Sequence, residues 1–355
     1  MCILGNLAHR GRTHRGPNFQ TTKIESGVNQ ARRKNMKVLI TGAAGCLGRR
    51  LIQSLVKQQG TEIFATDIKP ELGVEIANPE HGETLSYRAL DICHGDFSQW
   101  VEQVKPDVIV HLASILQISK AMPREKAYEI DVVATQKLVE LAAQIGCQKF
   151  LVTTSGASYG YWPENNGWLS EEHPKKGNQD YFYSAHKAEI EAYMEQAKTL
   201  YPQLKQVILR PGTILGPDFD GPIVNLFQQK MITGVAGFPG PFVFIWSEDV
   251  VAYIQEAMFS DIEGAYNLAG DGSVSMAQIA QTLSKPYLPL PSWLIEGALS
   301  ILKPLGLTQY GPEQVKFVKY RPVLANDKLK RTFHHQPRYT SQQALEQFLA
   351  LQKDV

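Results

Sequence analysis

The sequence contains little cysteine, little net charge and no long apolar run. Its four cysteines among 355 residues form no CxxC pair and no zinc-ligand spacing, so we expect reduced thiols, a cytoplasmic location and no metal site. A net charge of +1 gives no whole-protein field that would recruit nucleic acid or a membrane. No apolar run is long enough to cross a bilayer. The 43% hydrophobic and 20% charged residues are typical of a globular protein with a substantial core.

Residues 1–35 differ from the rest of the chain in charge. They carry seven cations against the single acid Glu25, with little apolar periodicity. They lack both the apolar core of a signal peptide and the amphipathic stripe of an organelle transit peptide. We therefore expect a disordered leader, a cloning remnant or an upstream start, with Met36 as the beginning of the fold.

A three-glycine loop follows the first apolar strand. Val38–Ile40 is typical of a strand that is buried on both faces, and Gly42, Gly45 and Gly48 come next in TGxxGxxG spacing. Apolar residues then recur at helical period at Leu51, Ile52, Leu55 and Val56. The glycines allow a tight turn, close approach of the backbone to a pyrophosphate and close packing of helix on strand. The free N–H groups at the helix start favour the phosphate charge. The motif predicts a dinucleotide site.

Asp67 gives a second signal for a dinucleotide. It ends the predicted strand Glu62–Ile68, 19 residues after Gly48. A carboxylate at this strand tip can accept hydrogen bonds from both hydroxyls of the adenosine ribose, and it repels a 2′-phosphate. We therefore expect NAD rather than NADP. The alternative is that Asp67 only terminates the strand.

Strand and helix patterns alternate along the chain as in βαβ units. They predict an α/β fold, a Rossmann-type doubly wound parallel sheet with a smaller C-terminal substrate-binding lobe. We place the NAD-binding domain at 36–215, with 243–270 returning to it, and the lobe mainly at 216–355. The predicted elements include Asp107–His111, Tyr128–Ile145, Lys149–Thr154, Asp180–Leu200, Val207–Arg210 and Tyr266–Leu268.

The segment Trp293–Leu302 predicts an apolar helix of about three turns. It is too short to span a membrane, so we expect it to form lobe core or a lid. Docking on a membrane surface is the alternative.

Three residues have the chemistry of alcohol oxidation. Tyr183 and Lys187 stand four apart on a predicted helix and project from one face, and Ser155 follows a predicted strand end. An alcohol that gives up hydride must also lose its proton, so a general base must contact the hydroxyl oxygen. Free tyrosine has a pKa of about 10, and a nearby lysine ammonium together with the positive nicotinamide ring lowers it. Ser155 can hydrogen-bond the same oxygen. These three residues are our catalytic candidates.

Together these motifs resemble the extended short-chain dehydrogenase/reductase family, the NAD-dependent epimerase/dehydratase group. The resemblance covers about Met36–Phe348 and includes TGAAGCLG at 41–48, HLAS at 111–114, TSGASYG at 154–160, YSAHK at 183–187, RPGTILGP at 210–217, SEDVV at 247–251 and YNLAG at 266–270. It implies that Ser155, Tyr183 and Lys187 are catalytic. It also implies that Lys187 bonds the nicotinamide ribose and that Pro211 and Gly212 meet the nicotinamide. The cofactor contacts that we expect are Gly42, Gly45, Leu47, Gly48, Asp67, Asp91, Ile92, Leu112, Ala113, Tyr183, Lys187, Pro211 and Gly212.

The chain departs from this family in three places. Gly156 and Ala157 stand where dehydratases and decarboxylases carry acids, so we do not expect that chemistry. Asp131 stands where the family helix usually carries an asparagine, so we do not carry over the family's outer proton relay to this chain. Sugar-nucleotide members carry an arginine before the segment matching SEDVV, whereas 237–246 contains no cation; Arg321 or Lys230 are possible substitutes.

The predicted function is that of an NAD-dependent oxidoreductase or epimerase. It would transfer hydride between nicotinamide and a secondary hydroxyl or ketone of a small substrate, with Tyr183 as general base. The alternatives are a nucleotide-sugar 4-epimerase that holds NAD tightly and a non-catalytic dinucleotide sensor. The helices predicted at 128–145 and 180–200 resemble the pair through which family members dimerise, so the resemblance implies a homodimer. We expect His111 to be a structural strand-end residue.

Overall fold

The structure is a computed structural model that describes residues 35–73, 84–119, 122–217, 219, 222–308 and 311–353. These residues belong to one compact unit, Asn35–Val355. Apart from Asn35, the leader expected at 1–35 lies outside the described residues. The division into an NAD-binding domain and a substrate lobe stays a prediction.

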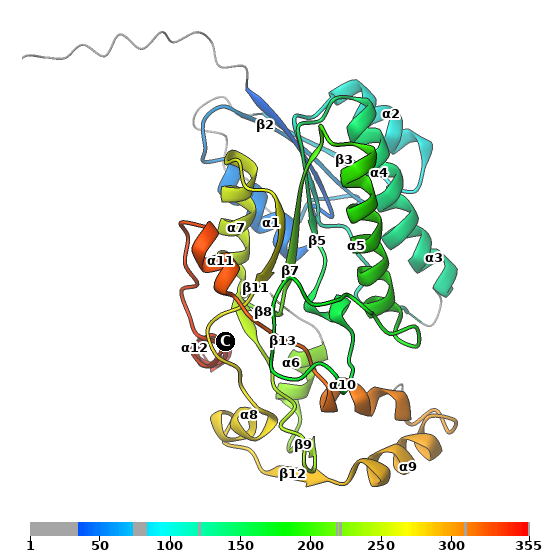
Figure 1. The fold of residues 1–355 in the computed structure, drawn as a ribbon, viewed down its shortest axis with the longest axis vertical. Coiled ribbons are helices and arrows are strands. Elements are labelled where there is room, and N and C mark those ends of the chain that lie inside the picture. The colour runs from blue at the N-terminus through cyan, green and yellow to red at the C-terminus, as the bar shows by residue number, and fades with distance from the viewer. Residues whose placement is uncertain are drawn as a thin grey trace, which may run out of the picture. The chain divides into compact units, whose positions relative to one another are not determined.

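Within the described residues, seven parallel strands form the central sheet in the order β11–β7–β5–β4–β1–β2–β3 (Figure 1). Their bounds are β1 Met36–Thr41, β2 Thr61–Asp67, β3 Leu85–Ala89, β4 Val108–His111, β5 Lys149–Thr153, β7 Lys205–Pro211 and β11 Gly264–Leu268. The strand order reverses between β1 and β4, where a doubly wound sheet opens a crevice for a ligand. The predicted α/β Rossmann-type fold is confirmed.

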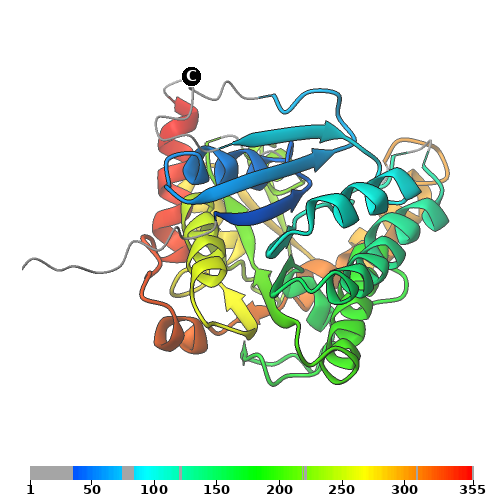
Figure 2. The ribbon, with the colours of Figure 1, turned by 90° about the horizontal axis from the view of Figure 1, so that it is seen from above.

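Helices cover both faces of this sheet (Figure 2). One core packs α1, α7 and α11 against the sheet, and a second core packs α2, α4 and α5 against the other face. Their bounds are α1 Cys46–Leu55, α2 Gly95–Val104, α4 Ala134–Gln144, α5 Phe182–Leu200, α7 Ser247–Phe259 and α11 Asp327–Thr332. Along β1, Val38 and Ile40 enter the first core and Leu39 the second. This alternation explains why the whole strand is apolar.

The helix expected at 128–145 begins earlier and is not uniform. It consists of α3 Arg124–Tyr128, a π-helical turn at Glu129–Val133 and α4. Asp131 lies buried in the π turn, where its side chain bonds residues outside this helix. Because π turns are often found at functional sites, the departure is informative.

A third core lies beyond the sheet, among segments that follow residue 213. Short parallel pairs join β8 to β10, β9 to β12 and β6 to β13. The remaining bounds are β6 Trp168–Leu169, β8 Thr213–Leu215, α6 Pro222–Gln228, β9 Ile232–Val235, β10 Phe244–Trp246, α8 Met276–Thr282, β12 Tyr287–Leu290, α9 Ser292–Leu302, α10 Val315–Lys319, β13 Val323–Leu324 and α12 Ser341–Lys353.

The apolar helix α9 forms as predicted, but none of its residues is buried. The interpretation of this helix as lobe core is therefore wrong. Among the described helices, none has the length and apolar character that a membrane span requires.

Candidate active site

The glycine loop between β1 and α1 has the shape that a dinucleotide needs. Gly42 has a φ of +67°, and a Cβ there would lie 2.5 Å from the backbone nitrogen of Ala113. A Cβ at Gly48 would lie 2.5 Å from the carbonyl oxygen of Gly42. Gly45 is the N-cap of α1 and makes no side-chain cap hydrogen bond, so its place at the start of the helix suits the approach of a phosphate. Leu47 packs against the first core. The loop therefore fits the pyrophosphate of NAD.

The strand ends next to this loop carry the other expected contacts. Asp67 Oδ2 accepts the Ala44 N–H at 3.0 Å, and Oδ1 accepts the Lys69 N–H at 3.2 Å. Each carboxylate oxygen retains a further acceptor position, which a ribose hydroxyl can use. Leu112 and Ala113 directly follow β4 and contact the backbone of Gly42.

Asp91 and Ile92 lie just beyond β3, beside the end of β2. The Leu90 N–H donates to the Asp67 carbonyl at 3.0 Å, and this bond holds the segment after β3 next to the end of β2. Asp91 Oδ1 accepts the Cys93 N–H at 2.9 Å. Burial acts to raise the pKa of Asp91, but the Cys93 hydrogen bonds and the Lys126 charge outweigh it and lower the pKa. Ile92 packs against the second core. Adenine contact by this pair stays a prediction.

A cavity of about 620 Å³ brings together residues that the sequence singled out separately. Ser155, Tyr183, Pro211 and Gly212 all line it; Tyr183 belongs to α5, and the other three lie at or just after the ends of β5 and β7. Parallel strands deliver their carboxyl ends to one edge of the sheet, which explains this convergence. The predicted base and the predicted nicotinamide contacts thus share one cavity.

Tyr183 is partly buried in the wall of the cavity. Burial raises the pKa of Tyr183 to about 12, and its hydrogen bond with Ser155 acts in the lowering direction. The sequence predicted a lowered pKa from Lys187, whose Nζ lies 5.6 Å from the centre of the Tyr183 ring. In the chain by itself desolvation is the largest effect on this pKa. Phenolate formation therefore needs additional positive charge at the site.

Lys187 lies about one helical turn after Tyr183 on α5. Its Nζ donates to Ser114 Oγ at 2.8 Å and to the Thr153 carbonyl at 3.4 Å. Burial lowers the pKa of Lys187, while the Asp131 and Glu191 charges act to raise it. Lys187 therefore lies next to Tyr183, and its contact with a ribose stays a prediction.

Asp131 extends this network; the sequence analysis singled out Asp131 but not its partners Ser114 and His186. Its Oδ1 accepts from Ser114 Oγ at 3.1 Å and from the Ile115 N–H at 2.8 Å. Its Oδ2 lies 2.9 Å from His186 Nδ1. Burial acts to raise the pKa of Asp131, but the His186 hydrogen bond and the Lys187 charge outweigh it and lower the pKa. The sequence signal was present in HLAS and YSAHK, which contain Ser114 and His186.

His111 occupies a purely internal position. Its Nδ1 lies 2.7 Å from Thr41 Oγ1 and its Nε2 lies 2.9 Å from Thr135 Oγ1. Burial, with the Lys187 charge, lowers the pKa of His111 to about 3. Both ring nitrogens have hydrogen-bond partners, as expected of a structural residue at the end of β4.

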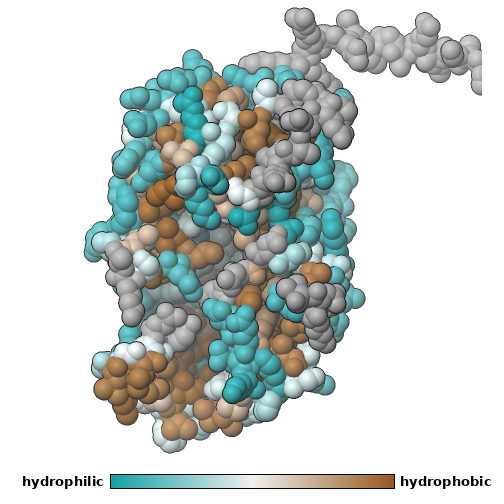
Figure 3. Space-filling model, turned by 180° about the vertical axis from the view of Figure 1, so that it is seen from behind, coloured by the Kyte–Doolittle hydropathy of each residue, from teal (hydrophilic) through white to brown (hydrophobic). Residues whose placement is uncertain are grey.

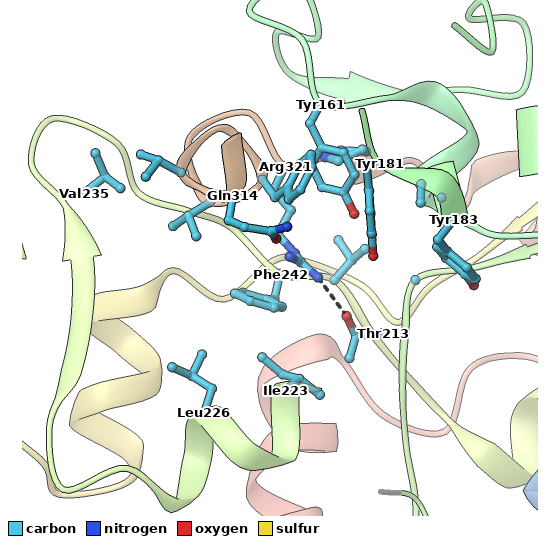
Figure 4. Close-up of a pocket in the computed structure, with 18 of the residues that line it drawn as sticks. Tyr161, Tyr181, Tyr183, Thr213, Ile223, Leu226, Val235, Phe242, Gln314 and Arg321 are labelled. Carbon is cyan, nitrogen blue, oxygen red and sulfur yellow. Dashed lines mark hydrogen bonds between the residues drawn. The ribbon is translucent and has the colours of Figure 1, made fainter. Parts of the chain in front are cut away.

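The part of the cavity beside Tyr183 is aromatic and contains a cation (Figure 4). Arg321 lies there among Tyr161, Tyr181 and Phe242, with its guanidinium 3.7 Å from the centre of the Phe242 ring. One Arg321 nitrogen donates to Thr213 Oγ1 at 3.3 Å. Desolvation lowers the pKa of Arg321, and the two tyrosines oppose it. Among the described lining residues Arg321 is the one charged side chain.

Comparison with known proteins gives consistent matches. The sequence model of the NAD dependent epimerase/dehydratase family matches residues 38–246. UDP-glucose 4-epimerase of Mycolicibacterium smegmatis is 27% identical over 56% of this chain and 64% of that relative. Sterol demethylase protein B of Methylococcus capsulatus is 26% identical over 76% of this chain and 82% of that relative.

Two solved structures share the fold. UDP-glucose 4-epimerase of Thermotoga maritima, with UDP-glucose, covers 90% of this chain and 99% of its own, with a TM-score of 0.69 and 17% identity. UDP-glucose 4-epimerase of Thermus thermophilus, complexed with NAD, covers 90% of this chain and 100% of its own, with a TM-score of 0.65 and 22% identity.

The chain belongs to the NAD-dependent epimerase/dehydratase family. Its cofactor is accordingly NAD, and it is an enzyme of the short-chain dehydrogenase/reductase type. Ser155 and Tyr183 line the cavity, and Lys187 Nζ lies 5.6 Å from the centre of the Tyr183 ring, so a hydroxyl, a phenol and an ammonium group stand close together.

Proposed function

We propose that this family member oxidises a secondary alcohol carried on a largely apolar skeleton, or reduces the matching ketone. The observation that carries the proposal is the cavity itself. It has Ser155 and Tyr183 at one end, and aliphatic and aromatic side chains such as Leu226 and Phe317 over much of the remainder. A cavity of this size and character suits a lipophilic small molecule.

The proposed roles follow from the positions of the side chains. Tyr183 takes the hydroxyl proton as the carbon–hydrogen bond breaks, and Ser155 holds the same oxygen by a hydrogen bond. Lys187 holds positive charge beside the phenol and is placed to meet a ribose. When bound, NAD supplies the two-electron acceptor and a positive ring that favours phenolate. Gly42, Gly45 and Gly48 hold the pyrophosphate, and Asp67 holds the adenosine ribose.

The comparisons support two substrate classes. Sterol demethylase protein B, by its name, acts on a sterol, which is an apolar molecule with a secondary hydroxyl. The second candidate is a nucleotide-sugar 4-epimerase, which the UDP-glucose 4-epimerase relative and Arg321 favour, because a guanidinium binds phosphate well. Arg321 stacks on Phe242 amid aromatic rings, a setting that also accepts a flat apolar body, so we favour the first class.

Net turnover of the cofactor separates the two candidates. A dehydrogenase accumulates NADH when it is incubated with NAD and its alcohol, whereas an epimerase returns the electrons to the same substrate. We expect NADH from sterol-like or other apolar secondary alcohols, and none from UDP-glucose. NAD that stays oxidised while UDP-glucose becomes UDP-galactose would establish the second candidate instead.

A homodimer and a cytoplasmic location are further parts of the proposal. The segments Arg124–Gln144 and Phe182–Leu200 pack against each other on one face of the sheet, as a four-helix interface requires of each subunit. Sedimentation as a monomer at micromolar concentration would contradict the dimer. The location rests on the sparse cysteine pattern of the sequence.

A further inference from the structure

Helix α9 has two apolar faces, and only one of them faces the protein. Ile295 and Leu299, four positions apart, line the substrate cavity. The opposite side is open: Trp293 is 71% exposed and Ile301 is 65% exposed. The exposed set, here called the α9 patch, comprises Trp293, Leu294, Ile301, Leu302, Leu305 and Leu307. It belongs to the brown area at the lower left of Figure 3.

The helical period makes the outer face of α9 a continuous apolar stripe. Trp293, Gly297 and Ile301 follow one another at intervals of four, and Leu294, Ala298 and Leu302 run beside them. No charged residue interrupts these two rows. Clustered exposed side chains of this kind mark an interaction surface rather than ordinary solvent-facing surface.

The charge around α9 indicates the occupant. The segments 222–242 and 272–322, which include α9 and α10, contain five lysines and the cavity residue Arg321 against Glu296 and Glu313. Lys303 directly follows α9, and Lys316 and Lys319 belong to α10, which packs against α9. Glu313 pairs with Lys303, and Asp180, just before α5, pairs with Lys316, and after these pairs the two segments still carry a net positive charge.

We propose that the α9 patch docks on the surface of a bilayer containing anionic phospholipid. The apolar stripe would enter the interface, the tryptophan would sit at headgroup level, and the lysines would meet the phosphates. At 11 residues α9 is suited to lie in the interface and too short to cross it. The inner face of the same helix lines the cavity, so a lipophilic substrate would enter from the bilayer. Only this delivery step rests on the proposed function; the docking does not.

Vesicle flotation of the NAD-saturated full chain tests the docking. The vesicles are phosphatidylcholine alone and phosphatidylcholine with phosphatidylserine. The patch variant is the double substitution Ile301→Ser and Leu305→Ser. The control is Leu200→Ser, which alters a leucine 61% exposed at the end of α5. We expect the wild type and the control to float with the mixed vesicles, and the patch variant to bind at least tenfold more weakly. All three should bind NAD equally and melt at the same temperature.

Two results would overturn the proposal. One is wild-type protein that stays below the vesicles, or a patch variant that floats as well as the wild type. The other is a wild type that self-associates without lipid and a patch variant that sediments as a smaller oligomer. This result would assign the surface to a second copy of the chain. None of these readouts uses turnover. A failure of alcohol oxidation is therefore distinguishable from a failure of docking.

Discussion

Lys187 Nζ donates a hydrogen bond to Ser114 Oγ across 2.8 Å, although the two residues are 73 positions apart in the chain. Ser114 Oγ in turn donates to Asp131 Oδ1 at 3.1 Å, and Asp131 Oδ2 meets His186. The carboxylate of Asp131 thereby stabilises the charge of a lysine whose pKa burial lowers. We infer that Asp131 is a positioning residue that keeps Lys187 protonated.

Substitution Asp131→Asn tests this role through the pH profile. Loss of the Asp131 charge should lower the pKa of Lys187 further, so the alkaline limb of kcat/KM should move to lower pH. Glu129→Gln, on the same π turn but partly exposed and paired with Lys126, is the control and should leave the limb in place. If the alkaline limb of kcat/KM is unchanged in Asp131→Asn, Asp131 does not keep Lys187 protonated and its role is only structural.

Cofactor selectivity tests Asp67. We expect NAD to bind at least about tenfold more tightly than NADP, about 1.4 kcal/mol, because the carboxylate bonds the ribose hydroxyls and repels a phosphate. Asp67→Asn keeps an oxygen for the Ala44 N–H but removes the charge, so it should narrow the preference mainly by improving NADP binding. Titration of both cofactors against both proteins measures this. Equal affinities in the wild type would remove the assigned role.

Stability should fall with acid because of His111. Its folded pKa is lowered to about 3 by burial, whereas an unfolded histidine titrates near about 6.5. The unfolded chain therefore binds the proton first, and the contribution of neutral His111 is complete above about pH 6.5 and is lost as the pH falls toward 3. Between these values the slope from this residue approaches about 1.4 kcal/mol per pH unit.

Urea unfolding of the wild type and His111→Gln between pH 7 and 4.5 measures the effect. The variant should be less stable at pH 7, because at least one of the Thr41 and Thr135 hydrogen bonds is lost, but it should lose less stability with acid. Parallel pH dependences for the two proteins would show that His111 is not the titrating group.

Much of this architecture was predictable because its signals are local. The apolar run at 38–40, the glycine spacing after it and Asp67 at the end of β2 lie within one βαβ unit, so the sequence pattern contains nearly all of their geometry. Tyr183 and Lys187 were equally accessible, since four positions on a helix fix their common face.

The remainder depends on contacts between distant segments. The π turn at Glu129–Val133 contains the carboxylate that bonds His186, 55 positions away, and no local period signals it. Arg321 enters the cavity from beyond α10, so only the tertiary fold could show its stacking on Phe242. The apolar composition of α9 predicted a helix correctly but not which of its faces the protein covers.

The most direct test of the account is the rate of alcohol oxidation by Tyr183→Phe, with Tyr181→Phe as a matched control. Both tyrosines line the same cavity, and each substitution removes one hydroxyl while keeping the ring. We predict that Tyr183→Phe loses about 10²–10⁴-fold in turnover with NAD affinity nearly unchanged, and that Tyr181→Phe keeps most of its activity. Near-normal turnover in Tyr183→Phe, on the alcohol that yields NADH with the wild type, would place the base elsewhere and contradict the mechanism.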